Sequence, residues 1–343
     1  MIDMLHKLRS FLDFDNIRYF KCSAFMLLPV VLIVPSIYCA LLSIAIGLVL
    51  SAISYLWHYL VKRICGDINT LPMCLVLVGG FSVGLTIVLN KYLIGCGKII
   101  FCASIISVCV FLSGYRDGVF NKARFLSALK KNALLLSVII LFGILRELLS
   151  NGTIANGIIG DGIRVTNGNA LSYINTFAGA VFIVTVLVYI FELIFKTKAI
   201  YLDFDKKGMV RTIFVVSLMT VIVTLFSRIT YSYVLTILKL TYLDKFCIFF
   251  YTALVVFLLQ KLISRYYANM IGSLTLSFSL YISYISISSV WFDVLVSVLY
   301  MLFIASVLNA IYLKTSSKCK MSVCLVYTSV LTLIIKLIAE MLI

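Results

Sequence analysis

Apolar runs long enough to cross a bilayer follow one another along most of this 343-residue chain. A helix needs about 20 mostly apolar residues to cross the hydrocarbon core of a membrane. Hydrophobic residues make up 63% of the sequence and charged residues only 12%, which leaves no room for a soluble catalytic domain. The sequence therefore predicts an all-α polytopic membrane protein with about nine to eleven spans, some of them broken half-helices.

Basic residues are concentrated in the connections between the apolar runs. Lys and Arg number 29 against 13 Asp and Glu, which gives a net charge of +16. In a soluble protein this excess would suggest nucleic acid, but between membrane spans it marks cytoplasmic loops. We expect contacts with the lipid bilayer and none with nucleic acid. The mixed-charge residues 1–22 are expected to form a cytoplasmic amphipathic lead-in.

The apolar runs predict the order of the spans. The first block, 23–60, is about twice the length that one helix needs and contains Pro29 and Pro35. We expect a short half-helix, a break near Pro35 and a full span over 37–60. The run 99–113 is short for a perpendicular crossing and predicts a second half-helix or a re-entrant segment. The other expected spans are 71–90, 133–149, 173–195, 212–227, 246–259, 270–290, 291–313 and 321–343.

Charge and glycine content assign the connections. The segments 114–131 and 196–211 are rich in Lys and Arg and are expected in the cytoplasm. The segment 150–170 has several glycines and one basic residue, Arg164, which predicts an external loop with little regular structure. The segment 231–243 is amphipathic and lies either in the membrane interface or across the membrane.

Small residues mark one expected span as a packing helix. The run 71–90 contains Gly79, Gly80 and Gly84. Positions without a side chain let a neighbouring backbone approach closely in lipid, so we expect another helix to pack there.

Groups able to carry catalysis are few. The chain has two histidines and no Ser-His-Asp arrangement or metal-ligand spacing, so a hydrolase is not indicated. His58, between Trp57 and Tyr59, is explained by an interfacial aromatic belt. Glu192 and Asp293 interrupt apolar runs, and a carboxylate inside a membrane is costly enough to indicate an ion or proton path. Pairing with a nearby lysine and a turn between two helices are the respective structural alternatives.

Ten cysteines are scattered along the chain without a Cys-x-x-Cys pair. This pattern does not favour a disulfide or zinc framework. Most of the cysteines are explained as small apolar residues of membrane helices.

The most distinctive string is GILRELLSNGTI, from Gly143 to Ile154. Its Arg146-Glu147 pair and its Asn151-Gly152-Thr153 ending resemble the end of the fifth helix in the Rnf/Nqr family. This family comprises the paired membrane subunits of the Rnf electron-transport complex and of the sodium-translocating NADH:quinone reductase. A local explanation of the pair is that it ends an apolar helix at the membrane surface, where both side chains are solvated.

Other landmarks of the family follow in the same order. The broken first helix with Pro29 and the short segment ending near Cys109 are similar to the family's two half-helices. The resemblance covers residues 23–195 as one subunit-length unit. After a basic linker at 196–211, a second unit at 212–343 is similar more weakly. A fused pair of units, arranged as an inverted repeat, is compatible with this pattern.

The resemblance implies a cofactor whose ligands are mostly missing. Family members hold an iron-sulfur centre between two subunits with cysteines of the half-helices, and such a cluster needs about four thiolates. Here Cys109 is the one candidate iron ligand, because Leu28 occupies the other family position and Cys247 lies too early in its segment.

The resemblance implies an integral membrane subunit of an Rnf/Nqr-like electron-transport or ion-translocating complex. Such a subunit relays electrons or has no catalytic group, works with other membrane subunits, and lies in the bacterial inner membrane with a cytoplasmic N-terminus. Two alternatives stay open. One is a non-redox multi-pass transporter or channel with Glu192 and Asp293 in its ion site. The other is a membrane glycan polymerase or flippase-like protein, against which the modest external loop argues.

Overall fold

The chain divides into two compact units. The computed structural model describes residues 26–27, 29–65, 70–92, 96–114, 122–158, 162–165, 180, 183, 186, 206–258, 276, 279–285 and 287. The first unit comprises Met1–Val34, Cys39–Ile139 and Val216–Val298, and the second comprises Pro35–Tyr38, Ile140–Val215 and Leu299–Ile343. The linear division into 23–195 and 212–343 stays a prediction.

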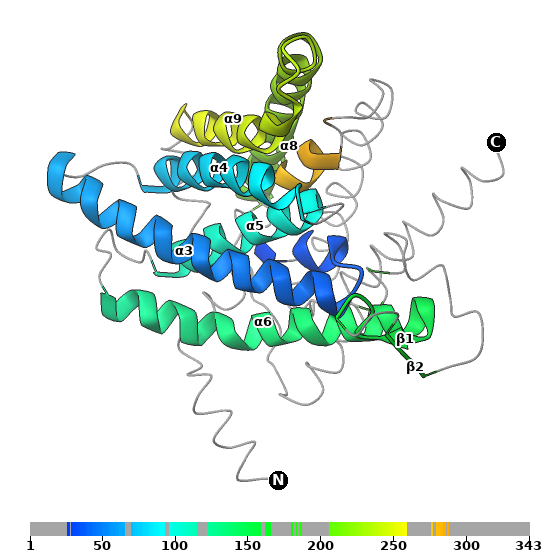
Figure 1. Cartoon of the computed structure of the whole chain (residues 1–343). Helices are drawn as coiled ribbons and strands as arrows, with labels where there is room; N and C mark the ends of the chain where they lie inside the picture. The colour runs from blue at the N-terminus through cyan, green and yellow to red at the C-terminus, as the bar shows by residue number, and fades with distance from the viewer. Residues whose placement is uncertain are drawn as a thin grey trace. The chain divides into compact units, whose positions relative to one another are not determined.

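Six helical stretches among the described residues are long and apolar enough to cross a membrane. They lie on the helices drawn in Figure 1, the last two with their adjoining turns. The chain is therefore a multi-pass α-helical membrane protein, which confirms the predicted fold class. The helices are α3 (Ile37–Cys65), α4 (Thr70–Leu89), α5 (Cys96–Gly114), α6 (Lys122–Asn151), α8 (Lys206–Thr230) and α9 (Asp244–Leu258).

The predicted break near Pro35 is confirmed. Residues 29–33 are helical, residues 34–36 are not, and α3 begins at Ile37 as expected. Proline has no backbone N–H and its ring clashes with the preceding turn, so a helix cannot pass through this position undisturbed. At its other end α3 continues past residue 60 to Cys65, with Lys62 and Arg63 in the last turn, where positive charge favours the helix dipole.

The predicted half-helix at 99–113 is wrong. Helix α5 begins at Cys96 and has 19 residues, and its apolar stretch is long enough to cross a membrane. Lys98 ended the apolar run in the sequence, but a lysine near a helix end can place its ammonium at the membrane surface. The stretch is 83% buried inside the protein, so α5 is a core helix.

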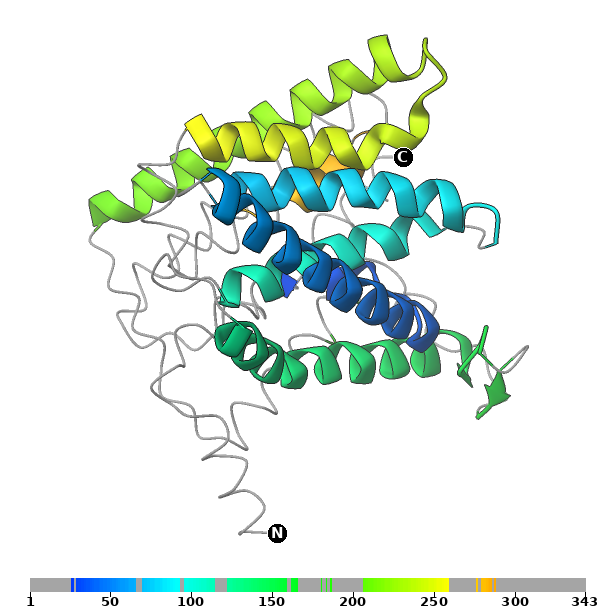
Figure 2. The ribbon, with the colours of Figure 1, turned by 60° about the vertical axis from the view of Figure 1, so that its left-hand side comes forward.

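Helices α4 and α9 lie side by side in both views (Figures 1 and 2). At Gly79, a Cβ atom would stand 2.9 Å from the Cβ of Phe249, so this glycine permits the close approach of α9. The predicted role in packing is confirmed for Gly79. At Gly80 and Gly84 a Cβ would meet nothing within 4 Å among the described residues, so packing at these two positions stays a prediction.

Two expected connections differ from the structure. Helix α6 begins at Lys122, so much of the predicted loop 114–131 is helical. The segment 150–170 contains an antiparallel pair of short strands, β1 (Thr153–Ile154) and β2 (Ile163–Arg164), where little regular structure was expected. In the segment 231–243, the π-helix η3 (Tyr231–Leu235) continues α8 and the 3₁₀ helix η4 (Thr241–Leu243) precedes α9; its place in the interface or across the membrane stays a prediction. The spans expected at 291–313 and 321–343 lie outside the described residues.

Candidate functional site

A buried carboxylate near the end of α6 joins two distant parts of the second unit. The side chain of Glu147 is 0% exposed. Its Oε2 atom accepts a hydrogen bond from the backbone N–H of Ile37 at 3.1 Å, and its Oε1 atom accepts one from the backbone N–H of Asn156 at 2.7 Å. Ile37 is the first residue of α3, and 110 positions separate it from Glu147. The carboxylate therefore fastens the end of α6 to the start of α3.

The break at Pro35 explains why an acceptor is needed there. The first N–H groups of any helix have no partner within the helix. The hydrocarbon core of a membrane supplies no water to hydrogen-bond such groups, so each group left unpartnered there costs free energy. A negative charge at a helix start also interacts favourably with the helix dipole. Glu147 supplies both the hydrogen bond and the charge.

The strand pair β1–β2 presents the second N–H group. Thr153 pairs with Arg164, and the turn between the strands contains Asn156. Ala155 and Gly162 (φ 76°) have backbone angles in the left-handed region, as do other glycines of this loop. A Cβ on Gly162 would stand 2.9 Å from the backbone N of Asn156, so this position requires glycine. The loop is thus shaped around the backbone group that Glu147 binds.

The structure brings the Arg146-Glu147 pair and the Asn-Gly-Thr ending into this arrangement. The local explanation of a solvated pair is wrong, because Arg146 is 4% exposed and Glu147 is fully buried. Asn151 ends α6, and its Oδ1 lies 3.1 Å from the hydroxyl of Ser150. Gly152 follows with φ 68°, and Thr153 begins β1 with a buried side chain. These residues shape the backbone around Glu147. Pro29 lies in the helical residues 29–33.

The candidate iron ligand has a polar neighbour in the first unit. Cys109 is buried on α5, and its thiol lies 3.7 Å from Oδ1 of Asn132 on α6. The amide nitrogen of Asn132 donates to Ser113 Oγ at 2.6 Å and to the carbonyl oxygen of Ala128 at 2.9 Å. In the part of the chain that the structure describes, no three His, Cys, Asp or Glu side chains come together as metal ligands.

The candidate path residues and His58 have different outcomes. Glu192 and Asp293, the candidate path residues, lie outside the described residues. Trp57 and Tyr59 are 44% and 56% exposed, as residues of an aromatic belt would be, whereas His58 between them is buried. Its ring meets that of Phe111 edge to face, with centroids 5.7 Å apart. The belt explanation therefore fails for His58, which points into the protein.

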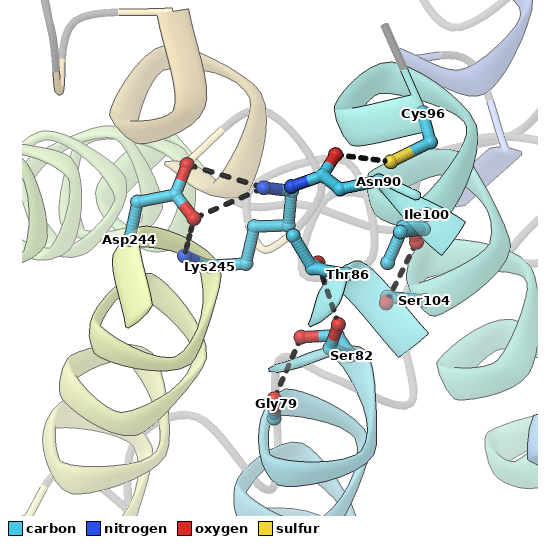
Figure 3. A network of polar contacts seen from close by, with 9 residues as sticks. All are labelled: Gly79, Ser82, Thr86, Asn90, Cys96, Ile100, Ser104, Asp244 and Lys245. Carbon is cyan, nitrogen blue, oxygen red and sulfur yellow. Dashed lines mark hydrogen bonds and ion pairs between the residues drawn. The ribbon is translucent and has the colours of Figure 1, made fainter. Parts of the chain in front are cut away.

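A partly buried ion pair is the feature that sequence reasoning missed. Lys245 Nζ lies 3.0 Å from Oδ1 of Asp244 and 3.2 Å from its Oδ2, and Lys245 is 4% exposed. Figure 3 shows the pair where the start of α9 meets the end of α4 and the start of α5. There Cys96 donates its S–H to Oδ1 of Asn90 at 2.8 Å, and the ammonium lies against Gly97. In the sequence, the adjacent Asp244 and Lys245 at a helix start were the signal that could have indicated this ion pair.

Comparison with family models, with curated proteins and with solved structures finds no match. What is established is the class that the helices define, a multi-pass membrane protein.

Proposed function

We propose that this chain is an integral membrane subunit of an ion-translocating complex of the Rnf/Nqr type. The observation that carries the proposal is the contact between Glu147 and Ile37. The string around Glu147 and the broken first helix are separate points of resemblance to that family. The two segments lie far apart in the sequence, yet the backbone N–H of Ile37 donates a hydrogen bond to the buried side chain of Glu147. Resemblance at two segments that meet in space supports the proposal more strongly than resemblance at either one.

The thiol inventory limits the proposed role of the chain. Cys109 stands at one family position, and an iron-sulfur cluster needs about four thiolates. The subunit would contribute at most one ligand from this position to a cluster shared with a partner. Its main role is then to line an ion path beside the broken first helix in the membrane.

Ion uptake into inverted vesicles tests the proposal. NADH-driven sodium or proton uptake should fall in vesicles from cells that lack the chain and recover when the chain is restored. Unchanged uptake would exclude membership of such a complex. A fall caused by loss of partner subunits is identified by quantifying those subunits in the same vesicles.

A pair of cysteine variants tests the electron-relay part separately. Cys109→Ser should lower the iron content and visible absorption of the purified complex if the thiol binds iron. Cys102→Ser is the matched control, since Cys102 is also buried on α5. Loss in Cys109→Ser alone supports a relay. If the two variants have equal spectra and ion uptake still depends on the chain, the translocating role is supported and the electron-relay role is excluded.

A non-redox transporter is the second candidate, and the partly buried Asp244–Lys245 pair favours it. Charged groups inside membrane proteins commonly mark substrate or ion pathways. This reading requires a solute whose uptake depends on the chain without NADH. Glu192→Gln and Asp293→Asn should alter that uptake, and full activity in both variants would exclude these acids.

A further inference from the structure

The interface between α3 and α5, within the first unit, is lined by hydroxyl groups. Ser43 Oγ donates to the carbonyl oxygen of Ile99 at 3.3 Å. Further along, a Cβ on Gly47 would stand 2.9 Å from the carbonyl oxygen of Ala103, and His58 meets Phe111. The partner numbers rise together along both helices. The two helices therefore run parallel and share one interface, called here the α3–α5 seam.

Two hydroxyl groups in this seam have no hydrogen-bond partner among the described residues: those of Ser54 and Ser107. Ser54 is 1% exposed and Ser107 is 0% exposed. On α3, Ser54 lies two turns after Gly47 and one turn before His58, so it faces the seam as they do. On α5, Ser107 lies one turn after Ala103, on the same ridge, and it faces the seam from the other side.

The two hydroxyl groups call for a water molecule. A buried hydroxyl without a partner costs free energy, and buried polar groups in proteins are regularly satisfied by internal water. Two such groups facing one seam provide the polar partners that a water requires. By contrast, the nearby hydroxyl of Ser104 donates to the carbonyl oxygen of Ile100 at 2.8 Å in its own helix and needs no water.

The seam is closed at one end. The contact at Gly47, where even a Cβ would stand 2.9 Å from Ala103 O and from Ile106, leaves no space for a water molecule between the backbones. Water must therefore enter from the other end, past His58 and Lys62. Histidine is a side chain that accepts and releases protons near neutral pH.

We propose that internal water connects Ser54 and Ser107 with His58, forming a hydrated half-path for protons that ends at Gly47. The ligand class is water, and His58, at the open end of the seam, is the titratable group that the water contacts. The half-path is a property of α3 and α5 and does not depend on the complex that the chain joins. It differs from the candidate path through Glu192 and Asp293.

Selective labelling makes this proposal testable, because the chain contains only two histidines, His6 and His58. Protein labelled with ¹⁵N-histidine and reconstituted in lipid gives two sets of ring signals, and His58→Gln assigns them. Transfer of magnetisation from water protons to the His58 ring nitrogens then reports water beside the ring. We expect clear transfer in the wild-type protein and a several-fold loss when Ser54 and Ser107 are both replaced by alanine.

Ser104→Ala is the matched control and should keep the wild-type transfer. Absence of transfer to His58 in the wild-type protein would overturn the proposal. Equal transfer in the wild-type protein and in the double variant would do the same. Thermal unfolding guards against misfolding. If the seam is hydrated, each single alanine variant should unfold at a lower temperature than the wild type. A dry seam predicts unchanged or higher temperatures and would contradict the water.

Discussion

Replacing Glu147 tests whether its carboxylate holds the broken first helix in place. In Glu147→Ala both backbone N–H groups, those of Ile37 and Asn156, lose their acceptor. In Glu147→Gln the amide oxygen still accepts one of them, while the amide nitrogen meets the other donor. The second variant therefore removes one hydrogen bond and the negative charge with almost no change in volume.

The magnitude follows from burial and from the number of bonds. A hydrogen bond to a charged group contributes about 1.5–3 kcal/mol to stability. Two such bonds in a site that is 0% exposed predict a loss of roughly 3–6 kcal/mol for Glu147→Ala. Glu147→Gln should lose about half of that, roughly 1.5–3 kcal/mol. The favourable interaction of the carboxylate with the start of α3 adds about 0.3–1 kcal/mol to both values.

Unfolding in mixed micelles with increasing dodecyl sulfate, followed by tryptophan fluorescence, measures these differences. The matched control is Leu149→Ala, on the same helix and with an exposed side chain, which should stay within about 0.5 kcal/mol of the wild type. The order of stability should be wild type, then Glu147→Gln, then Glu147→Ala. A glutamine variant as stable as the wild-type protein would refute the reasoning, because the charge would then contribute nothing.

Three further changes separate the remaining contacts. Gly79→Ala places a Cβ 2.9 Å from a side chain of α9 and should cost about 1–3 kcal/mol, whereas Gly80→Ala, with open space around it, should be neutral or slightly stabilising in the same unfolding assay. Asp244→Asn keeps an oxygen at the start of α9 but leaves the Lys245 ammonium buried without its counter-charge. The variant should lose about 3 kcal/mol of unfolding free energy, and adding Lys245→Met should recover most of this loss. Gly162→Ala forces a side chain into left-handed backbone beside the strand pair and should cost about 1–3 kcal/mol, and hydrogen exchange at residues 152–165 should be faster.

The sequence was sufficient to predict the helices that have clear physical boundaries. Proline interrupts a helix, so the sequence predicted the break near Pro35 and the start of α3 near Ile37. The failure at α5 has an equally plain cause. An apolar run ends at the first charge, but a helix does not, and Lys98 sits within the first turn of α5. Apolar length therefore underestimates helix length wherever a lysine lies near the membrane surface.

The candidate site was predicted less well, because the roles of its residues depend on contacts between segments that are distant in the sequence. Glu147 was singled out by its motif, but the sequence contains nothing that pairs it with Ile37. Ser54 and Ser107 were not singled out, since one serine among many in membrane helices carries no signal. His58 was explained by its two aromatic neighbours, although neighbours in sequence on a helix point about 100° apart. The direction of the His58 side chain follows from the face of α3 that it shares with Gly47.

The acids of the described residues point to where an ion site has to be sought. Of the 13 acids in the chain, the described residues include two, Glu147 and Asp244. Glu147 accepts the N–H of the first residue of α3, and Asp244 accepts the N–H of Lys245 in the first turn of α9 at 2.7 Å. Both carboxylates are occupied in stabilising helix starts, a need that any broken or short membrane helix creates.

A translocated cation requires a carboxylate whose oxygens are available, so the path acid is expected among the remaining eleven (13 − 2). Glu192 and Asp293 are the two of these that interrupt apolar runs. Glu192→Gln or Asp293→Asn should therefore lower ion uptake without destabilising the fold, while Glu147→Gln should lower uptake and stability together. If Glu147→Gln abolished uptake in a protein that unfolds like the wild type, Glu147 would be an ion ligand. Its assignment as a residue that stabilises the start of α3 would then be wrong.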